Sequence, residues 1–270
     1  MSGDIVLRET GRGRARWAAV AGQELRDLWL GGRGLVLAFA FTALLSVIAY
    51  LSATNEALNF LEQRESVNLT LQVAVAVGAL LALVVAADAV SGERERGTFE
   101  ALLLTPVARW QLLLGKLLAV LSLWFVALLR ALPYVWFLGR GVGVVGDAML
   151  TGLLVGTPVA LALAALGLAI SAFAATNRLS LSASVLVLLA LYAPTQLPLG
   201  ASQGWLAELL LRINPVTAAE HYSSGIVING HPWSQDTSWL LAPIAAAVVM
   251  TVIALVVAPR AMTLDGGVER

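Results

Sequence analysis

The sequence of 270 residues contains no cysteine, two histidines and a single lysine, Lys116. Without cysteine, the chain can form neither disulfides nor thiolate metal sites, and it has no thiol nucleophile. Charge is also scarce, because only 13% of the residues are charged, about half the share of a typical soluble domain. The 17 basic and 17 acidic residues cancel. The chain therefore has no net basic field that would point to nucleic acid as a partner.

Hydrophobic residues make up 59% of the sequence, and the mean hydropathy is +0.84. A helix needs about 20 apolar residues to cross about 30 Å of hydrocarbon. Six segments qualify, and they are 35–52, 69–87, 110–138, 149–173, 179–199 and 239–258. We therefore predict an all-α integral membrane protein with six transmembrane helices. A single domain covers residues 1–270, and its parts are a segment at 1–33, a bundle at 34–258 and a tail at 259–270.

Basic residues are distributed unevenly around the six spans. Thirteen lie in the N-terminal segment, between spans two and three, between spans four and five, or after span six, and three lie on the other side. Basic residues near span ends are retained in the cytoplasm, so we predict a multi-pass protein of a bacterial inner (plasma) membrane with both termini cytoplasmic. The N-terminal segment has no apolar signal core, and we expect no cleaved signal peptide. Arg130 lies about 30 Å along its helix from Trp110, which predicts that its side chain reaches the outer headgroups.

Residues 16–30, before the first span, have the periodicity of an amphipathic helix. Trp17, Leu25 and Leu28 fall on one face, and Arg26 falls on the opposite face. We predict a helix along the inner membrane surface. Glu24 falls within the apolar face, so it must either reach an arginine or pack against protein. A helix that only attaches the chain to the membrane is the alternative.

Charged residues interrupt the apolar pattern between spans two and three. Asp88 ends span two at the predicted inner surface of the membrane, where its charge can be hydrated. Four alternating charges follow, and they are Glu93, Arg94, Glu95 and Arg96. On their own, these charges are typical of a solvated run with internal pairing.

A short helix is predicted directly after the charged run. Thr98 is suited to the N-cap, and Glu100 falls in the positive first turn. The apolar residues of this turn are Phe99, Leu102 and Leu103. An apolar turn in a charged cytoplasmic loop is suited to dock into the cleft of another protein, and this interpretation is the alternative to a solvated loop.

The stretch ERERGTFEALLLTPVARWQLLLGK at 93–116 closely resembles the signature of type-2 ABC transporter permeases, the membrane subunits of a family that consists mostly of exporters. The matching positions are Glu93, Glu95, Gly97, Thr98, Glu100, Leu102, Leu103, Thr105, Pro106, Arg109, Gly115 and Lys116. The resemblance implies a coupling helix that binds a separate cytoplasmic ATPase dimer. Its expected contact residues are Glu93, Arg94, Glu95, Arg96, Gly97, Thr98, Phe99, Glu100, Leu102 and Leu103.

The resemblance extends over nearly the whole chain. The surface helix resembles the elbow helix of this family, with Trp17, Glu24, Leu25 and Leu28 as its residues. Between spans five and six, GWLAELLLRINPVTAAEHY resembles a pair of outer re-entrant helices with an Asn-Pro joint. The expected residues of that hairpin are Trp205, Leu209, Asn214 and Pro215.

The resemblance also implies which molecules act with the chain. The sequence has no phosphate loop of the form GxxxxGK[ST], because Gly115-Lys116 is followed by Leu117. ATP and Mg are therefore expected on a partner ATPase subunit, and this chain is expected to bind no cofactor and to be no enzyme. A permease of this family dimerises with itself or with a sister chain, surrounded by membrane lipid, and exports substrate between the two copies.

Three other functions have residue requirements that can be compared with the sequence. An intramembrane serine protease is suggested only by a GxSxG match at 200–204, which has no histidine base in span six. A zinc site from Glu220, His221 and His231 lacks the usual ligand spacing. A secondary transporter usually has ionisable residues at the middle of the membrane, and the predicted span interiors are nearly free of them.

Overall fold

The computed structural model describes residues 3–53, 60–196 and 205–262. Over these ranges the chain is helical apart from its connections and contains no β-strand. Six stretches are long and apolar enough to cross a membrane, and they are Arg33–Ser52, Gln63–Glu95, Arg109–Gly139, Val145–Phe173, Asn177–Thr195 and Thr237–Ala261. The predicted fold class, an all-α membrane protein with six spans, is confirmed.

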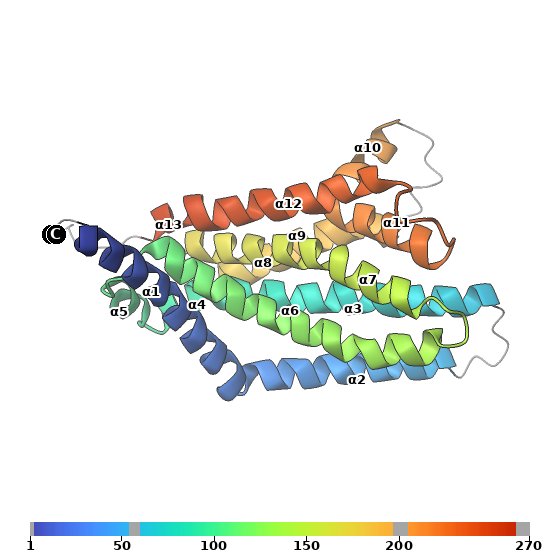
Figure 1. Ribbon diagram of the computed structural model, residues 1–270, viewed down its shortest axis with the longest axis horizontal. Helices are drawn as coiled ribbons and strands as arrows, with labels where there is room; N and C mark the ends of the chain where they lie inside the picture. Colours follow the sequence, from blue (N-terminus) through green and yellow to red (C-terminus); the bar gives the residue numbers. More distant parts are fainter. Residues whose placement is uncertain (1–2, 54–59, 197–204, 263–270) are drawn as a thin grey trace.

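The first half of the chain supplies three spans and the charged loop between the last two. Its elements are α1 (Gly3–Leu30), α2 (Arg33–Ala53), α3 (Phe60–Asp88), α4 (Ser91–Glu95), α5 (Phe99–Leu103) and α6 (Arg109–Gly139). Figure 1 shows α1 leaving the bundle at an angle to α2, with α4 and α5 beside it at the same end of the molecule. The α1 helix packs against α6 and α2.

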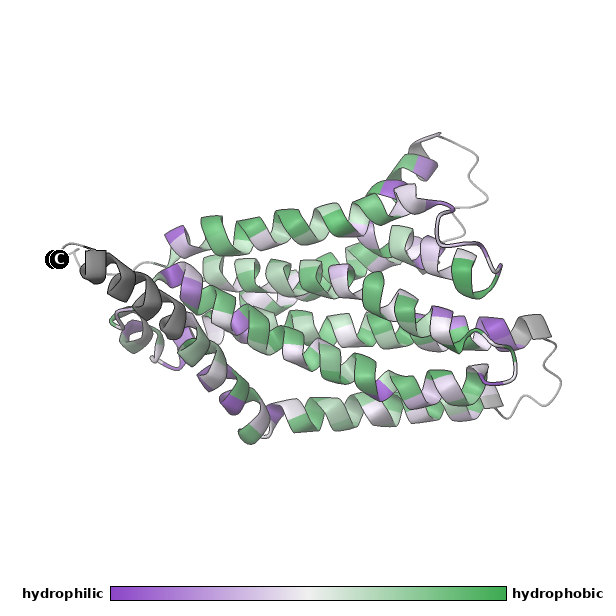
Figure 2. Cartoon of the chain, viewed as in Figure 1, coloured by the Kyte–Doolittle hydropathy of each residue, from purple (hydrophilic) through white to green (hydrophobic). Residues whose placement is uncertain are grey.

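The second half of the chain supplies the other three spans. Its elements are α7 (Val145–Leu154), α8 (Gly156–Phe173), α9 (Asn177–Gln196), α10 (Trp205–Ile213), α11 (Pro215–Val227), η2 (Thr237–Leu240), α12 (Leu241–Val252), η3 (Ile253–Val257) and α13 (Ala258–Ala261). In Figure 1, α13 lies at the end that holds α1 and α5, and α10 and α11 lie at the opposite end. Hydrophobic residues fill the middle of the long helices, and hydrophilic residues are concentrated toward their ends (Figure 2).

The bundle has a central layer of three spans. In spans two, three and four, 50–61% of the most apolar window is buried, whereas in spans one, five and six the share is 17–28%. The α3 helix packs against both α6 and α8. A Cβ atom at Gly167 would lie 2.7 Å from the carbonyl oxygen of Leu83, so this glycine lets the backbones of α8 and α3 touch. Spans one, five and six therefore present most of their surface to lipid or to another chain.

Two spans depart from a single α-helix near prolines. Span four, predicted as one helix over 149–173, is divided between α7 and α8 at Val155. Pro158 follows in the first turn of α8, and its ring would clash with the carbonyl of Leu154 in a continuous helix. In span six, the π-helical turn η3 precedes Pro259 for the same steric reason.

Candidate functional site

The loop between α3 and α6 is built from two short helices. Gly97 joins α4 to α5 and has a φ of +71°, a left-handed conformation that favours glycine. Thr98 donates a weak hydrogen bond from its hydroxyl to the carbonyl of Glu93, at 3.3 Å. A helix after Thr98 was predicted, but α4 within the charged run was not.

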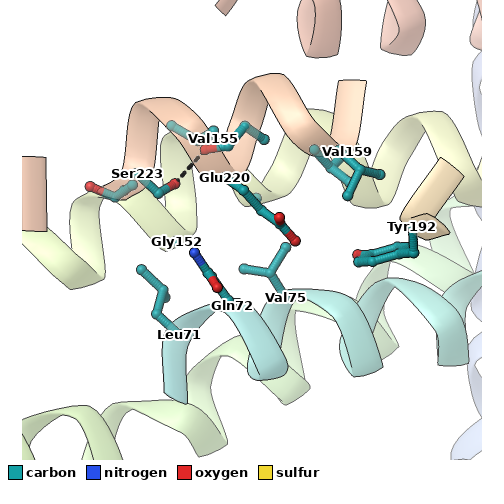
Figure 3. Close-up of a pocket in the computed structure, with 13 residues that line it drawn as sticks. Leu71, Gln72, Val75, Gly152, Val155, Val159, Tyr192, Glu220 and Ser223 are labelled. Atoms are coloured by element: carbon teal, nitrogen blue, oxygen red, sulfur yellow. Dashed lines mark hydrogen bonds between the residues drawn. The ribbon is translucent and has the colours of Figure 1, made fainter. Parts of the chain in front are cut away.

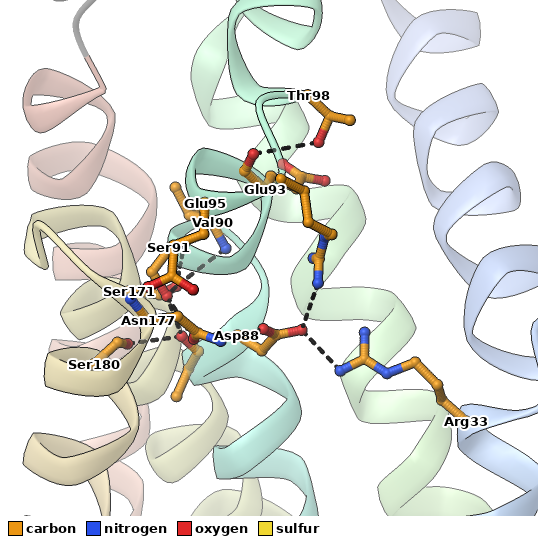
Figure 4. A network of polar contacts seen from close by, with 12 residues as sticks. Arg33, Asp88, Val90, Ser91, Glu93, Glu95, Thr98, Ser171, Asn177 and Ser180 are labelled. Atoms are coloured by element: carbon orange, nitrogen blue, oxygen red, sulfur yellow. Dashed lines mark hydrogen bonds and ion pairs between the residues drawn. The ribbon is translucent and has the colours of Figure 1, made fainter.

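Buried hydroxyl groups fix α4 onto the connection between α8 and α9 (Figure 4). Ser171 on α8 accepts hydrogen bonds from the backbone N–H groups of Val90 and Ser91, at 3.0 and 2.9 Å. The hydroxyl of Ser91 lies 3.0 Å from Oδ1 of Asn177 at the start of α9. Ser91 and Ser171 are both fully buried. The loop therefore begins on a rigid support rather than as a free excursion from span two.

Arg94 and Glu95 continue this attachment with charged groups. The Arg94 guanidinium donates to the carbonyl of Ala174, where the chain leaves α8, and it lies over the Phe99 ring at 5.0 Å. A carboxylate oxygen of Glu95 accepts from the backbone N–H of Asn177 at 2.8 Å, which places a negative charge at the N-terminus of α9. Both side chains hold the loop on its own bundle.

Asp88 is the centre of a second group of contacts (Figure 4). Its Oδ2 lies 2.7 Å from Arg33 Nη2 and 3.6 Å from Arg96 Nη1, and its Oδ1 accepts from the Asn177 side chain at 2.8 Å. The prediction that α3 ends at Asp88 is confirmed. The prediction that this charge is hydrated is wrong, because Asp88 is 8% exposed and two arginines balance its carboxylate.

Lys116 joins three elements at one buried point. Its Nζ lies 2.7 Å from Oε1 of Glu24 on α1 and 2.5 Å from Oε1 of Glu93 on α4, while its own helix is α6. The Lys116 side chain is 2% exposed, whereas those of Glu24 and Glu93 are 24% and 20% exposed. The sequence left open whether Glu24 reaches an arginine or packs against protein. It pairs with the single lysine instead.

Close packing of α1 on α6 makes this meeting possible. A Cβ atom at Gly115 would lie 2.7 Å from Cγ1 of Val20, so a larger residue would push α1 away. On the predicted apolar face, Leu28 is buried, and Trp17 and Leu25 are partly buried. Sequence reasoning predicted the surface helix and the charged loop separately and missed their contact. The feature of the sequence that could have predicted this contact is the single lysine, Lys116, of the Gly-Lys pair. A lysine at the start of a buried helix needs acidic partners to neutralise its charge.

The accessible surface begins at the end of the charged run, where Glu95 and Arg96 are exposed, and continues beyond it. Gly97, Thr98 and Glu100 are exposed, and Leu104 is 75% exposed. Phe99 is buried in a hydrophobic cluster that includes Val90 and Leu113, so its ring holds α5 in place beneath this surface. The side chains of Leu102 and Leu103 lie outside the described residues.

Two cavities separate α1 from the loop. One of ≈ 570 Å³ is lined by Gln23, Thr98 and Thr105, among other residues. A more polar one of ≈ 250 Å³ is lined by residues that include Asp27, Arg33 and Lys116. Because Glu24 and Glu93 line both cavities, the Lys116 ion pairs bridge a gap between α1 and the loop. Force applied to the loop can therefore reach α1 through these side chains.

The opposite end of the molecule carries the predicted hairpin. A helix lies on each side of Asn214, and Pro215 occupies the first turn of α11. Asn214 Oδ1 accepts from the N–H of Val216 at 2.9 Å, and its Nδ2 donates to the carbonyl of Leu191 on α9 at 2.7 Å. Trp205 and Leu209 on α10 are exposed. The re-entrant position of this pair in a membrane stays a prediction.

A carboxyl group faces the bundle interior near this hairpin. Figure 3 shows Glu220 on α11 directed toward Val75 of α3 and Tyr192 of α9. The pocket at this place has a volume of ≈ 20 Å³ and is lined mainly by apolar side chains, so it has room for about one water molecule. Burial raises the pKa of the Glu220 carboxyl to about 7. Sequence reasoning considered this residue only as a metal ligand.

The residues of the other weighed functions do not form a site in the described part of the chain. His221 stacks on Trp239 with ring centroids 4.0 Å apart, and His231 lies 3.6 Å from Asp236. Within residues 3–53, 60–196 and 205–262, no group of three metal-ligating side chains occurs. The GxSxG match at 200–204 lies outside the described residues.

Comparison with known proteins identifies one family. The model of the family described as "ABC-2 family transporter protein" matches residues 18–263, from α1 to the end of the last span. The comparison with curated proteins gives no match.

Proposed function

The chain belongs to the ABC-2 family of transporter proteins and is a membrane subunit of an ABC transporter, and we propose that it dimerises and couples ATP hydrolysis by a separate cytoplasmic ATPase to substrate export. In this proposal ATP and Mg bind to the ATPase subunit, and the end of the molecule with α1, α5 and α13 faces the cytoplasm. Four arginines at that end, Arg33, Arg96, Arg109 and Arg178, support this orientation.

The observation that carries the proposal is a small exposed surface on a firmly attached loop. Gly97, Thr98, Glu100 and Leu104 are exposed, and α4 beneath them is bonded to α8 and α9. A protein that grips this surface would move the cytoplasmic ends of α3, α8 and α9 together. Through Lys116 it would also move α1 and α6. A loop with free charges could not transmit displacement in this way.

The uneven burial of the spans supports the proposed dimerisation. The outer faces of α2, α9 and α12 are apolar and exposed, with Val36, Leu186 and Val248 as examples. Lipid covers part of this surface, and we propose that a second copy or a sister chain covers the rest. Substrate would then pass between the two permeases during the ATPase cycle, and the direction we propose is outward.

Two charge-introducing variants test the docking surface. Leu104→Asp and Glu100→Arg alter exposed side chains for which no bond to the bundle is present in the described part of the chain. The tagged permease is co-expressed with a candidate ABC ATPase subunit from the same genome, and the captured ATPase is quantified after purification. We expect each variant to reduce capture at least fivefold without altering yield or thermal stability.

The matched control is Glu208→Arg, which reverses an exposed charge on α10 at the opposite end. Its capture of the ATPase should equal that of the unmodified chain. Equal capture by all three variants would refute the proposed docking surface. If inside-out vesicles that contain the Leu104→Asp variant still take up substrate in an ATP-dependent manner, coupling through this loop is refuted.

A further inference from the structure

A polar cluster connects the outward faces of two neighbouring spans, α2 and α6. The hydroxyls of Ser46 and Tyr134 lie 2.7 Å apart, and the Arg130 guanidinium donates to Oγ1 of Thr42 at 2.9 Å. Both contacts join residues 88 positions apart, so α2 and α6 run in the same direction and in register (Figure 1). Arg130 is therefore level with Thr42.

This register sets the depth of Arg130 in the membrane. Thr42 lies about 13 Å beyond Arg33, where α2 begins, and about 16 Å before Ala53, where it ends, at 1.5 Å per residue. Trp29, just before α2, donates to Ser122 at 3.0 Å, and Ser122 precedes Arg130 by about 12 Å. Both estimates place Arg130 near the middle of the membrane.

The prediction that Arg130 reaches the outer headgroups is therefore wrong. It was based on a count from Trp110, as if α6 entered the membrane at its first residue. The first turns of α6 instead lie beside α1 at the cytoplasmic end, where Lys116 pairs with Glu24. About three turns of α6 precede the level at which α2 begins.

An arginine at this depth has no ion pair in the part of the chain that the structure describes. A guanidinium has five N–H donors, yet the only hydrogen bond of Arg130 among the described residues goes to the neutral hydroxyl of Thr42. Arg130 is exposed at the surface of the bundle rather than enclosed in it. A charged side chain is costly in hydrocarbon and, where it occurs, marks ligand or ion sites.

We propose that Arg130, held at this level by its hydrogen bond to Thr42, binds the acidic headgroup of an amphiphilic substrate. A carboxylate or phosphate matches the fork of guanidinium donors. The hydroxyls donate within the bundle, Thr42 to the carbonyl of Ala38 and both Ser46 and Tyr134 to the carbonyl of Thr42, so they position the arginine and do not donate to the headgroup. The surrounding exposed side chains are apolar, with Val47, Leu129 and Phe137 49–64% exposed. An alkyl chain can lie along these residues while its headgroup meets the arginine.

This inference rests on the proposed transport function and narrows the substrate to acidic amphiphiles. A water-soluble anion would have to cross the apolar surface around Arg130 without an alkyl chain to stabilise it. A cationic or neutral amphiphile would leave the arginine unpaired. The chemistry of the cluster therefore selects both the headgroup charge and the apolar tail.

Photolabelling of the full chain in lipid nanodiscs tests the site, with a diazirine-bearing dodecyl phosphate as the probe. We expect labelled peptides from α2 and α6. Unlabelled dodecyl phosphate or dodecanoate should compete, and their relative strengths separate phosphate from carboxylate recognition. Dodecyltrimethylammonium should not compete. Arg130→Gln should reduce labelling at least tenfold, while Arg130→Lys should retain an intermediate level because the charge is kept.

The control variant is Arg140→Gln, which removes an exposed arginine from the outer end of the same helix, and its labelling should be unchanged. Equal labelling of Arg130→Gln and the unmodified chain would overturn the proposal, and so would competition by the cationic amphiphile. Absent labelling together with weaker self-association of Arg130→Gln would show that a second copy covers the site, which also overturns it.

Two further measurements separate this site from the proposed function. ATP-dependent uptake of dodecyl phosphate by inside-out vesicles is expected for a substrate, and a labelled but untransported probe would overturn the substrate assignment. ATPase capture by Arg130→Gln should equal that of the unmodified chain. If the unmodified chain captures no ATPase but is still labelled at α2 and α6, the transport function fails while the binding site stands.

Discussion

Replacing Lys116 by methionine removes the cation that Glu24 and Glu93 share. Methionine has nearly the volume of the lysine stem, so the change leaves little empty space in the buried position. It does leave two carboxylates facing each other, and Oε2 of Glu93 already lacks a hydrogen bond in the described part of the structure. The expected result is a less stable contact of both α1 and α4 with α6.

The size of the effect follows from burial. Loss of one partner from a buried ion pair destabilises a protein by about 3–5 kcal/mol. Here the lysine is 2% exposed, but the glutamates are 24% and 20% exposed and can regain some water. We therefore expect a loss of about 2–3 kcal/mol. The change Glu24→Gln with Glu93→Gln in the Lys116→Met background removes the unpaired charges and should restore most of that loss.

The measurement is the free energy of unfolding of the purified chain in mixed micelles, followed by helical circular dichroism during titration with dodecyl sulfate. Transport provides a second readout, because the triple variant keeps its packing but loses the charged link between the loop and α1. We expect its ATP-dependent transport to fall at least tenfold while ATPase capture is retained.

Two results would refute this reasoning. If Lys116→Met unfolds within about 0.5 kcal/mol of the unmodified chain, the ion pairs do not hold α1 and α4 on α6. If the stable triple variant transports at the normal rate, the Lys116 contacts are structural only, and the loop must act on the spans through α4, α8 and α9.

Three further predictions concern the rest of the bundle. Gly167→Ala should lower the free energy of unfolding by about 1–3 kcal/mol, because the added Cβ would lie 2.7 Å from the Leu83 carbonyl, whereas alanine at the open position Gly146 should have a smaller effect in the same titration. Asn214→Ala should lower the free energy of unfolding by about 1–2 kcal/mol, because it removes the N-cap of α11 and the hydrogen bond to Leu191. Asn214→Asp should restore the N-cap alone. Equal stability of the two variants would show that the cap does not stabilise α11. The pKa of the Glu220 carboxyl, about 7, lies above the unfolded value of 4.5, so the contribution of this group to stability is complete below pH 4.5 and is lost as pH rises through 7. Glu220→Gln should remove up to about 3 kcal/mol of this pH dependence between pH 5 and 8. An unchanged slope of stability against pH would show that the carboxyl is hydrated.

Much of the fold was predictable because it depends on local properties of the sequence. Length and hydropathy predict the six spans, and the structure moves most of their ends by only a few residues. The resemblance predicts the joint at Asn214-Pro215, and a proline at this place favours the end of one helix and the start of the next. The division of span four between α7 and α8 was not predicted, although the sequence contains Pro158. Only one residue separates the two helices, so the hydropathy stays high across the break and does not indicate it.

The candidate site was less predictable because it depends on contacts between distant residues. Lys116 lies 92 positions from Glu24 and 23 from Glu93, and no periodicity relates such positions. The resemblance located the loop but did not separate residues that hold it from residues that are exposed. That distinction required the positions of Ser171 and Asn177, which carry no motif of their own.

Contacts from neighbouring helices explain why the surroundings of Asp88 and the depth of Arg130 were predicted wrongly. A count of residues along one helix gives its length, but the neighbouring helices determine where the membrane begins. Asp88 was placed correctly along α3, yet it is enclosed because Arg33 and Asn177 approach from α2 and α9. Arg130 was placed too far outward because α6 starts below the level of α2. Pairing with Thr42 corrects its depth, and an apparently ordinary surface arginine then becomes a charge that needs an acidic ligand.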